Sequence, residues 1–409
     1  MNITINNDHL QRIGFTTVPR STNIFGKTLE LVVEWNTHTV EKIDAKNKCL
    51  CHFIPPHMQD YIKNHAQDTL PQYYSAIYNA QYNKAKDFRN HRNEKTILFK
   101  KEAQIFSQTK SKPNGETLQK IYDARNRTSL PGKIAKDVNH TKSSQSFDVT
   151  VNRAFDTTKK TYDFYSNVFK RNSIDGKGMQ LISTVHYDRN YCNAFWNGEQ
   201  MVYGDGDQTI FADFTLDIDV SAHEMTHGVT EHTLGLVYEN QSGALNEHIS
   251  DSFGSMVEQY SQNQSSKEAD WLIGERVLIG PGALRSMMAP GTAYNTPQLG
   301  KDPQPSRMAD YAKMPNDDEN DYGGVHINSG IPNHAFYLAC MELGGNSWDK
   351  VGKIWYKTLS DKKLTPNATF VDFANSTIRS AKKLSKGNKE WTGKEAEVIK
   401  KAWVTVEVL

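Results

Sequence analysis

The sequence predicts an α+β fold, in which a β-rich lobe precedes an α-helical lobe and a small domain precedes both. From about residue 118, short segments such as LISTVHY (181–187) and QMVYGDGD (200–207) alternate apolar and polar side chains and end in turn residues, as strands do. From about residue 219, apolar residues recur near every 3.6 positions, as in helices packed on a core. The expected helices are 153–169 and 219–232 in the first lobe, the second of them at the junction of the lobes, and 242–260, 329–343, 347–359 and 367–383 in the second lobe.

Composition changes along the chain divide it into four regions. Residues 79–117 are almost all polar or charged, which predicts a linker that proteases can reach. Before it, 28–43 alternates like a strand, and Pro55–Pro56 interrupts the chain ahead of a short helical stretch. We place the regions at 1–48, 49–100, 101–235 and 236–409, the third being the β-rich lobe and the fourth the α-helical lobe.

Charge and hydropathy exclude several classes of partner. The chain has 48 basic and 47 acidic residues and a formal net charge of +1, so we expect neither nucleic acid nor a membrane surface to bind it. The sequence contains no run of about 18 apolar residues, so no membrane-spanning helix is predicted. The start, MNITINNDHLQRIGF, has no basic stretch followed by an apolar one, so no conventional signal peptide is expected. We expect synthesis in the cytoplasm and, by default, a monomer.

Cysteine is scarce. Four cysteines are too few for a disulfide framework in 409 residues, which predicts free thiols and a reducing compartment of synthesis. They are Cys49, Cys51, Cys192 and Cys340.

The string HEMTH, at 223–227, predicts a metal site. Residues four apart lie about one turn apart on the same helix face, so His223 and His227 can bind one small cation. Glu224 lies about 100° further round, beside the open side of such an ion. Imidazole and carboxylate ligands favour zinc, and a catalytic zinc site needs three protein ligands. The alternative is two polar side chains on an ordinary amphipathic helix.

A third ligand is expected from the helix at 242–260. Glu247 and Asp251 are four residues apart and adjoin an apolar stripe, so the helix brings carboxylates toward the core, where they need a cation or donors. Glu247 would complete the zinc site. Asp251 could accept the outer N–H of His223, and Asn246 that of His227.

With these motifs, the sequence resembles the thermolysin-like zinc metallopeptidases, and within them the short-propeptide protealysin subgroup. The resemblance covers roughly residues 114–409 and implies a two-lobed zincin, with the active-site helix between the lobes and a propeptide domain before them. KIYDARN, FYSNVFKRNSID and NYCNAFWNG are similar to the protealysin subgroup. The family strings are NAFWNGEQMVYGDGD (193–207), DVSAHEMTHGVTEHT (219–233), YENQSGALNEHISDSFG (238–254), ALRSM (283–287) and YGGVHINSGIPNHAFY (322–337).

The resemblance implies one zinc ion per chain, bound by His223, His227 and Glu247, and a general base, Glu224, that deprotonates the water on the metal. His326 and Tyr238 would donate hydrogen bonds to the oxyanion, and Asp321 would hold the His326 ring. The residues expected to hold the substrate main chain are Asn193, Ala194, Trp196 and Arg285.

The same resemblance implies an apolar pocket for the residue after the scissile bond. An apolar side chain entering it leaves no polar group unpaired, so we expect cleavage on the amino side of bulky residues such as Leu or Phe. The pocket residues are Phe211, Phe214, Val220, Ile273 and Leu284.

A calcium site is a further expectation from relatives that carry one. Clustered carboxylates suit a hard cation. Against it, Arg276 stands where those relatives have an acid, and Leu272 replaces a glutamate. The acidic residues that match are Asp219, Glu258, Asp270 and Glu275.

CLCHFIPPHMQDYI, at 49–62, resembles the short inhibitory propeptide of the protealysin subgroup, with Pro55, Pro56 and His57 where that subgroup has Pro-Pro-Leu. An extended double proline without amide N–H groups suits inhibition, and His57 could add metal affinity. The alternatives are that the prolines only start a helix, and that a thiolate of Cys49 or Cys51 caps the zinc. Residues 1–48 have no assigned role.

The sequence thus predicts a self-inhibited zinc endopeptidase that acts on proteins and peptides and matures by cleavage within about 85–115. One alternative is an inactive, zinc-bearing member that binds peptides; another is a zinc hydrolase for small molecules. Retention of both Glu224 and His326 argues against the first, and Asn193 and Arg285 argue against the second. Most relatives are extracellular, which would require a non-conventional export route.

Overall fold

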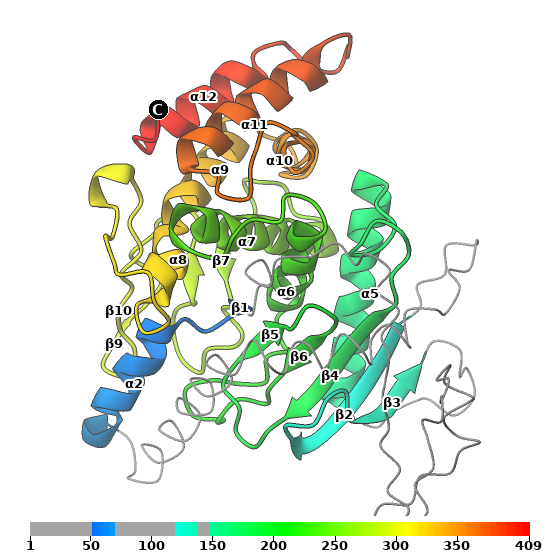
Figure 1. Ribbon diagram of the computed structural model, residues 1–409, viewed down its shortest axis with the longest axis vertical. Helices are drawn as coiled ribbons and strands as arrows, with labels where there is room; N and C mark the ends of the chain where they lie inside the picture. The colour runs from blue at the N-terminus through cyan, green and yellow to red at the C-terminus, as the bar shows by residue number, and fades with distance from the viewer. Residues whose placement is uncertain (1–50, 70–118, 138–147) are drawn as a thin grey trace, which may run out of the picture. The chain divides into compact units, whose positions relative to one another are not determined.

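The β-rich lobe is built on one mixed sheet. In the computed structural model, which describes residues 51–69, 119–137 and 148–409, six strands lie in the order β1-β5-β6-β4-β2-β3 (Figure 1). β2 pairs with β4 and β4 with β6 in parallel, and the other neighbours are antiparallel. The strands are β1 (Cys51–His52), β2 (Gln119–Arg127), β3 (Lys133–Asp137), β4 (Leu181–Tyr187), β5 (Ala194–Trp196) and β6 (Met201–Tyr203).

The described residues all belong to one unit, residues 45–409. β4 coincides with the strand predicted at 181–187, and β6 lies within the one predicted at 200–207. The strand predicted at 28–43, the linker predicted at 79–117 and Cys49 lie outside the described residues.

The helices follow the predicted order, and the α+β class is confirmed. α5 (Val149–Phe169) starts at Asp148, whose side chain accepts from the amides of Thr150 and Val151, and it packs on β2 and β4. The other expected helices appear as α6 (Ile218–Glu231), α7 (Asn240–Gln262), α9 (Gly330–Leu343), α10 (Val351–Thr358) and α11 (Phe370–Ser385). The structure adds α2 (Pro56–Thr69), α8 (Asp321–Asn328), α12 (Glu395–Thr405), the 3-10 turn η2 (Met308–Asp310) and the strand pairs β7 (Leu272–Ile273) with β8 (Arg285–Ser286) and β9 (Asn295–Thr296) with β10 (Gly300–Lys301).

α6 and α7 lie side by side between the sheet and the C-terminal helices (Figure 1). Both are buried over most of their length, so their polar residues face other protein groups and not water. Gly254 permits the close approach, because a Cβ there would lie 2.9 Å from the backbone oxygen of Asp219. Polar side chains on the facing sides of these two helices are therefore brought together.

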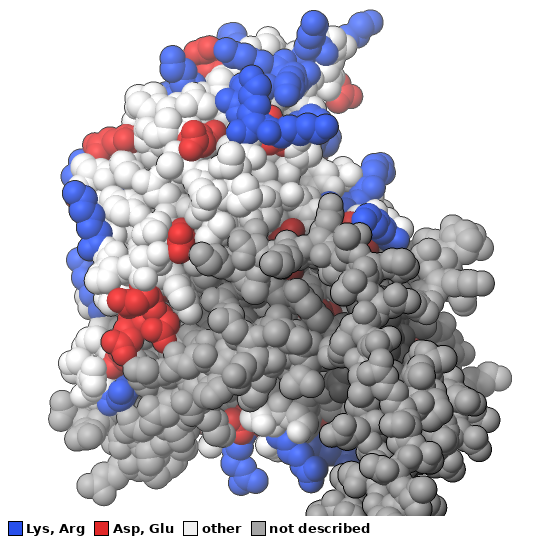
Figure 2. Space-filling model, viewed as in Figure 1, with Lys and Arg blue, Asp and Glu red and all other residues white. Residues whose placement is uncertain are grey.

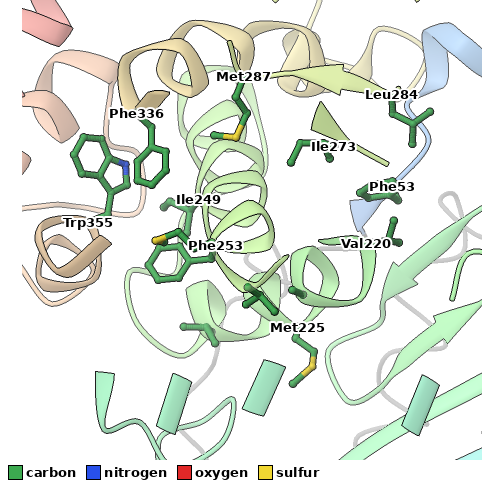
Figure 3. Close-up of a cluster of buried hydrophobic side chains, with 14 of the residues drawn as sticks. Phe53, Val220, Met225, Ile249, Phe253, Ile273, Leu284, Met287, Phe336 and Trp355 are labelled. Carbon is green, nitrogen blue, oxygen red and sulfur yellow. The ribbon is translucent and has the colours of Figure 1, made fainter. Parts of the chain in front are cut away.

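A continuous apolar core surrounds the two helices. Ile249 and Phe253 of α7 pack toward Phe336 of α9 and Trp355 of α10 (Figure 3). The core also includes Phe53, from the segment that precedes α2. That segment is therefore packed into the lobe that follows it in sequence.

The exposed charges are unevenly placed. Lysine and arginine side chains gather over α11 and α12 in Figure 2, where the exposed lysines include Lys382, Lys383 and Lys386. Among the described helices, none is both long enough and apolar enough to cross a membrane.

Candidate metal centre and active site

Two histidines of α6 and one glutamate of α7 direct their ligand atoms at a common centre. Those atoms of His223, His227 and Glu247 lie within 4.8 Å of one another, and all three residues are buried. The two Nε2 atoms are 2.9 Å apart, and they lie 3.4 Å and 3.5 Å from the Glu247 carboxylate. Glu247 Oε2 is buried but accepts no hydrogen bond. Two imidazoles converging on such a carboxylate fit a zinc ion.

Partners on α7 orient both imidazole rings. His223 Nδ1 donates to Asp251 Oδ1 at 2.8 Å, and His227 Nδ1 donates to Asn246 Oδ1 at 2.9 Å. Each ring therefore turns Nε2 toward the centre. Asp251 also accepts from Nε and Nη2 of Arg285, at 2.9 Å and 2.8 Å. Burial opposes the charge of Asp251, but Arg285 and His223 outweigh it and hold its pKa well below the usual range.

Glu224 follows the first ligand on α6 and turns its carboxylate toward β5. Its Oε2 accepts from the backbone N–H of Trp196 at 2.8 Å, and its buried Oε1 has no hydrogen-bond partner. Burial raises the pKa of Glu224 to about 8. A carboxyl group with a pKa near neutrality can take up a proton and release it again.

His326 and Tyr238 lie beside the third ligand. Asp321 holds His326 twice, through the ring Nδ1 at 2.7 Å and the backbone N–H at 2.8 Å. His326 Nε2 lies 3.4 Å from Glu247 Oε2 and 3.3 Å from the Tyr238 hydroxyl, which itself donates to Glu247. Burial opposes the charge on His326, but Asp321 and Glu247 outweigh it and raise its pKa. Both side chains can donate to negative charge formed next to Glu247.

A turn of left-handed residues brings Asp321 back to His326. The φ angles are 55° at Asp321, 50° at Tyr322, 87° at Gly323 and 72° at Gly324. The positive φ of Gly323 is one that L side chains rarely adopt, so this position favours glycine. The glycine pair thus folds an acid onto an imidazole five residues later.

The residues predicted to hold a substrate main chain hold the chain's own residues 51–54. β1 extends the sheet antiparallel to β5, with Cys51 opposite Trp196, and Phe53 N–H donates to the Ala194 carbonyl at 3.0 Å. Asn193 binds both backbone groups of Ile54, accepting from N–H at 2.8 Å and donating to the carbonyl at 3.3 Å. Arg285 Nη1 donates to the Phe53 carbonyl at 3.3 Å.

The Phe53 side chain reaches both a metal ligand, His223, and the predicted pocket. Its ring meets the His223 ring edge-on with centroids 5.0 Å apart, and the Arg285 guanidinium lies 4.8 Å from its centroid. Figure 3 shows Phe53 between Val220 and Leu284. The five predicted pocket residues are all buried: Phe211, Phe214, Val220, Ile273 and Leu284.

The double proline lies where α2 begins. Pro56 is the first residue of α2, and the Pro55 carbonyl accepts from the amides of Met58 and Gln59. His57 Nε2 lies 3.3 Å from the Tyr294 hydroxyl, and its buried Nδ1 has no hydrogen-bond partner. Pro56 therefore does start a helix, and the inhibitory role of the motif stays a prediction. Phe53, just before it, contacts the metal ligand His223.

A second carboxylate cluster lies where α6 begins. Oxygens of Asp217, Asp219 and Glu258 lie within 4.8 Å of one another, and one oxygen each of Asp217 and Asp219 is buried without a hydrogen-bond partner. Burial, with Asp217 nearby, raises the pKa of Glu258 to about 8. Of the predicted calcium residues, Asp219 and Glu258 belong to this cluster. Asp270 and Glu275 are exposed and do not.

Sequence reasoning missed two members of these sites. Asp217 stands just before α6, and only the approach of α7 shows that it faces Glu258. Phe53 and Ile54 form an apolar pair just before the double proline. That pair was the available sequence signal for a buried anchor. Cys192 and Cys340 form no disulfide among the described residues, as predicted, and both are buried.

Comparison with known proteins agrees with this geometry. Two family descriptions match: the catalytic domain of the thermolysin metallopeptidases at residues 79–231, and their alpha-helical domain at 234–408. An extracellular metalloprotease of Pectobacterium carotovorum is 49% identical over 299 residues, which are 72% of this chain and 82% of that protein. Protease PrtS of a Photorhabdus species is 50% identical over 267 residues, covering 64% of this chain and 71% of that protein.

A solved structure extends the similarity to the fold. The precursor of protealysin, a metalloproteinase from Serratia proteamaculans, is 43% identical and superposes with a TM-score of 0.75. The match covers 88% of this chain and 100% of the protealysin precursor chain. The chain belongs to the thermolysin family of metallopeptidases and is a metalloendopeptidase.

Proposed function

We propose that this metalloendopeptidase uses one zinc ion bound by His223, His227 and Glu247, with Glu224 as general base. The observation that carries the proposal is the convergence of two oriented imidazoles on a buried carboxylate oxygen that accepts no hydrogen bond. A zinc ion held there would polarise the substrate carbonyl and lower the pKa of a water ligand. Glu224 takes the proton of the attacking water and passes it to the departing amine nitrogen.

His326 and Tyr238 stabilise the negative charge that forms on the carbonyl oxygen. Their donor atoms lie 3.3 Å apart beside Glu247, and Asp321 holds the imidazole in place. Because the site is buried, such hydrogen bonds act without competition from bulk water.

The substrate is an extended peptide with a bulky apolar residue after the scissile bond. Asn193, Ala194 and Arg285 offer donors and acceptors to an extended main chain, as they do to residues 53–54. The apolar pocket then binds the following side chain. A peptide library should show cleavage before Leu and Phe; preference for a charged residue there would contradict the assignment.

The precursor inhibits itself by occupying its own cleft. Residues 51–54 use the edge of β5 and the main-chain donors, and Phe53 fills the space beside Leu284. A substrate cannot occupy the same groups while this segment is bound. We take Phe53 as the anchor of this segment.

Phe53→Ala in the full-length chain tests this anchor. Loss of a buried phenylalanine removes about 3 kcal/mol of docking energy, which raises the undocked fraction ~100-fold. We expect the unprocessed variant to cleave a quenched peptide that the unprocessed parent leaves intact. His65→Ala, an exposed change on α2, the helix that follows Phe53, is the control and should stay latent. Equal latency of both variants would exclude Phe53 as the anchor.

The catalytic assignment is tested by intact mass over time on the full-length parent and Glu224→Gln. The parent should lose roughly 100 N-terminal residues, by cleavage within 85–115, whereas Glu224→Gln should stay whole with zinc bound. A variant that processes itself at the parent's rate would show that Glu224 is not the base.

The second carboxylate cluster is a candidate calcium site, with Asp217, Asp219 and Glu258 as ligands. Two buried oxygens without hydrogen-bond partners support a cation there. A calcium-selective chelator should then lower the melting temperature, and an unchanged value would mean that the cluster holds no calcium.

The proposed domain roles follow the predicted boundaries. Residues 49–100 form the inhibitory segment and linker, and 101–235 and 236–409 the catalytic lobes. We further propose that the protein is a monomer. We also propose that it acts outside the cell, since its Pectobacterium relative is an extracellular metalloprotease.

A further inference from the structure

His248 follows the third metal ligand on α7 and is completely buried. Its ring makes edge contacts with Phe336 and Trp355, on the side of α7 that faces α9 and α10. Figure 3 shows those two aromatic residues beside α7. An imidazole in such a core needs a hydrogen-bond partner for each ring nitrogen.

The partners of His248 define its protonation state. Trp355 Nε1, which can only donate, lies 2.8 Å from His248 Nε2, so that nitrogen must be an unprotonated acceptor. The proton therefore sits on Nδ1, which donates to Asn333 Oδ1 at 2.8 Å. Ser252 Oγ lies 3.3 Å from the same nitrogen, and its hydroxyl rotates to accept a second, weaker bond.

The orientation of Asn333 follows in turn. With its oxygen on His248, its Nδ2 faces Asp251 and donates to Oδ2 at 2.9 Å. Asp251 Oδ1 accepts from Nδ1 of His223, the first metal ligand. Trp355, His248, Asn333 and Asp251 thus form a chain of hydrogen bonds that ends at His223. Each bond in this chain fixes which atom of the next side chain donates and which accepts.

We propose that Trp355, His248 and Asn333 form a positioning network that sets the donor groups around Asp251 and thereby tightens zinc binding by His223. The inference rests on the metal site proposed above and concerns affinity for zinc, not the chemical step. None of the three residues touches substrate or metal.

The indole N–H selects the tautomer. Without it, the His248 proton can move to Nε2, and Nδ1 becomes an acceptor. Asn333 would then turn its amide group toward His248 and its oxygen toward the Asp251 carboxylate, so two acceptors would face each other. Asp251 would lose a donor and gain a repulsive neighbour while it still has to orient His223.

Trp355→Phe in the full-length protein is the test, and Trp403→Phe is its matched control. Both indoles are fully buried, they stack on each other with centroids 6.1 Å apart, and Trp403 Nε1 donates instead to Thr377 Oγ1 at 2.9 Å. Each change removes one indole ring and one buried hydrogen bond, so each should lower the unfolding temperature to a similar extent. Only Trp355 is connected to Asp251.

The deciding readout is the zinc dissociation constant, measured by chelator competition. Changes in residues that orient metal ligands weaken binding ~10- to 100-fold, and we expect about tenfold for Trp355→Phe. Trp403→Phe should stay within about twofold of the parent. Equal zinc affinities in the two variants would overturn the network. A parent chain that binds no zinc would instead overturn the metal site itself.

A measurement on the parent keeps the proposal testable if Trp355→Phe does not fold. Nitrogen-15 NMR of the histidine side chains should show His248 neutral, with its proton on Nδ1. A proton on Nε2, or on both nitrogens, contradicts the order of donors and overturns the proposal.

Discussion

Two clusters of possible metal ligands lie along α6 and α7, and they are built differently. In the metal centre, His223 and His227 each donate to a partner on α7, and Asp251 is fixed in turn by Arg285 and Asn333. In the acidic cluster, Asp217, Asp219 and Glu258 face one another, and two of their buried oxygens have no partner.

The difference separates a preorganised site from a conditional one. The metal centre holds its ligands in place through neighbouring protein groups, so binding zinc costs little rearrangement. The acidic cluster has no such neighbours for every oxygen, and burial raises the pKa of Asp219 and Glu258. It can be stabilised by a cation or by protonation, and which of the two applies depends on the solution.

The largest expected effect is on zinc binding. Glu247→Gln removes one of three ligands and should weaken zinc affinity at least ~100-fold. Glu258→Gln makes the same chemical change in the acidic cluster and should leave zinc affinity unaltered. Zinc analysis after dialysis against a chelator distinguishes them, and similar zinc loss in both would mean that the clusters are not independent.

A smaller effect should separate the clusters in the opposite direction. A calcium ion present at about 100 times its dissociation constant stabilises the folded chain by about 2.7 kcal/mol. The parent and Glu247→Gln should both melt at a higher temperature when calcium is added, and Asp217→Asn should not respond. A calcium response that survives in Asp217→Asn would place the ion elsewhere.

The smallest expected effect concerns His186, which lies outside both clusters and has an aspartate beside each ring nitrogen. His186 Nδ1 lies 2.8 Å from Asp205, and Nε2 lies 2.9 Å from Asp148 at the start of α5. Asp205 and Asp148 outweigh burial and raise the pKa of His186 to about 9.

Because the folded pKa of His186 exceeds the usual 6.5, its stabilising effect is complete below about pH 6.5 and is lost as the pH rises through about 9. The melting temperature of His186→Gln should therefore lie below that of the parent at pH 6 and approach it by pH 10. A constant difference across this range would mean that the pair of aspartates does not hold the charged form.

Much of the fold could be predicted because the signals are local. The spacing of His223 and His227 places both on one helix face, and the periodicity of 242–260 brings Glu247 to the same core. α8 could not be predicted in this way, because its start is a turn in which Tyr322, Gly323 and Gly324 have left-handed φ values. Periodicity carries no information about such a turn.

What the sequence could not supply are relations between distant elements. Asp217 joins Glu258 because Gly254 lets α6 and α7 approach, and Phe53 reaches His223 because β1 pairs with β5. His248 belongs to no sequence motif that would indicate a role. Its hydrogen bond to Trp355, which is 107 positions away, is visible only in the fold. A single sequence without related sequences gives no measure of such pairings.

The place of β1 at the edge of the sheet has a consequence for the proteins this enzyme can attack. A substrate that replaces β1 must present several residues in extended form, with backbone groups free to pair with β5 and the side chains of Asn193 and Arg285. A helix, or a strand already paired in its own sheet, cannot do this. The rate of attack on a folded protein should thus follow how often a short stretch of it unfolds, so that the enzyme reports the local stability of its targets as much as their sequence.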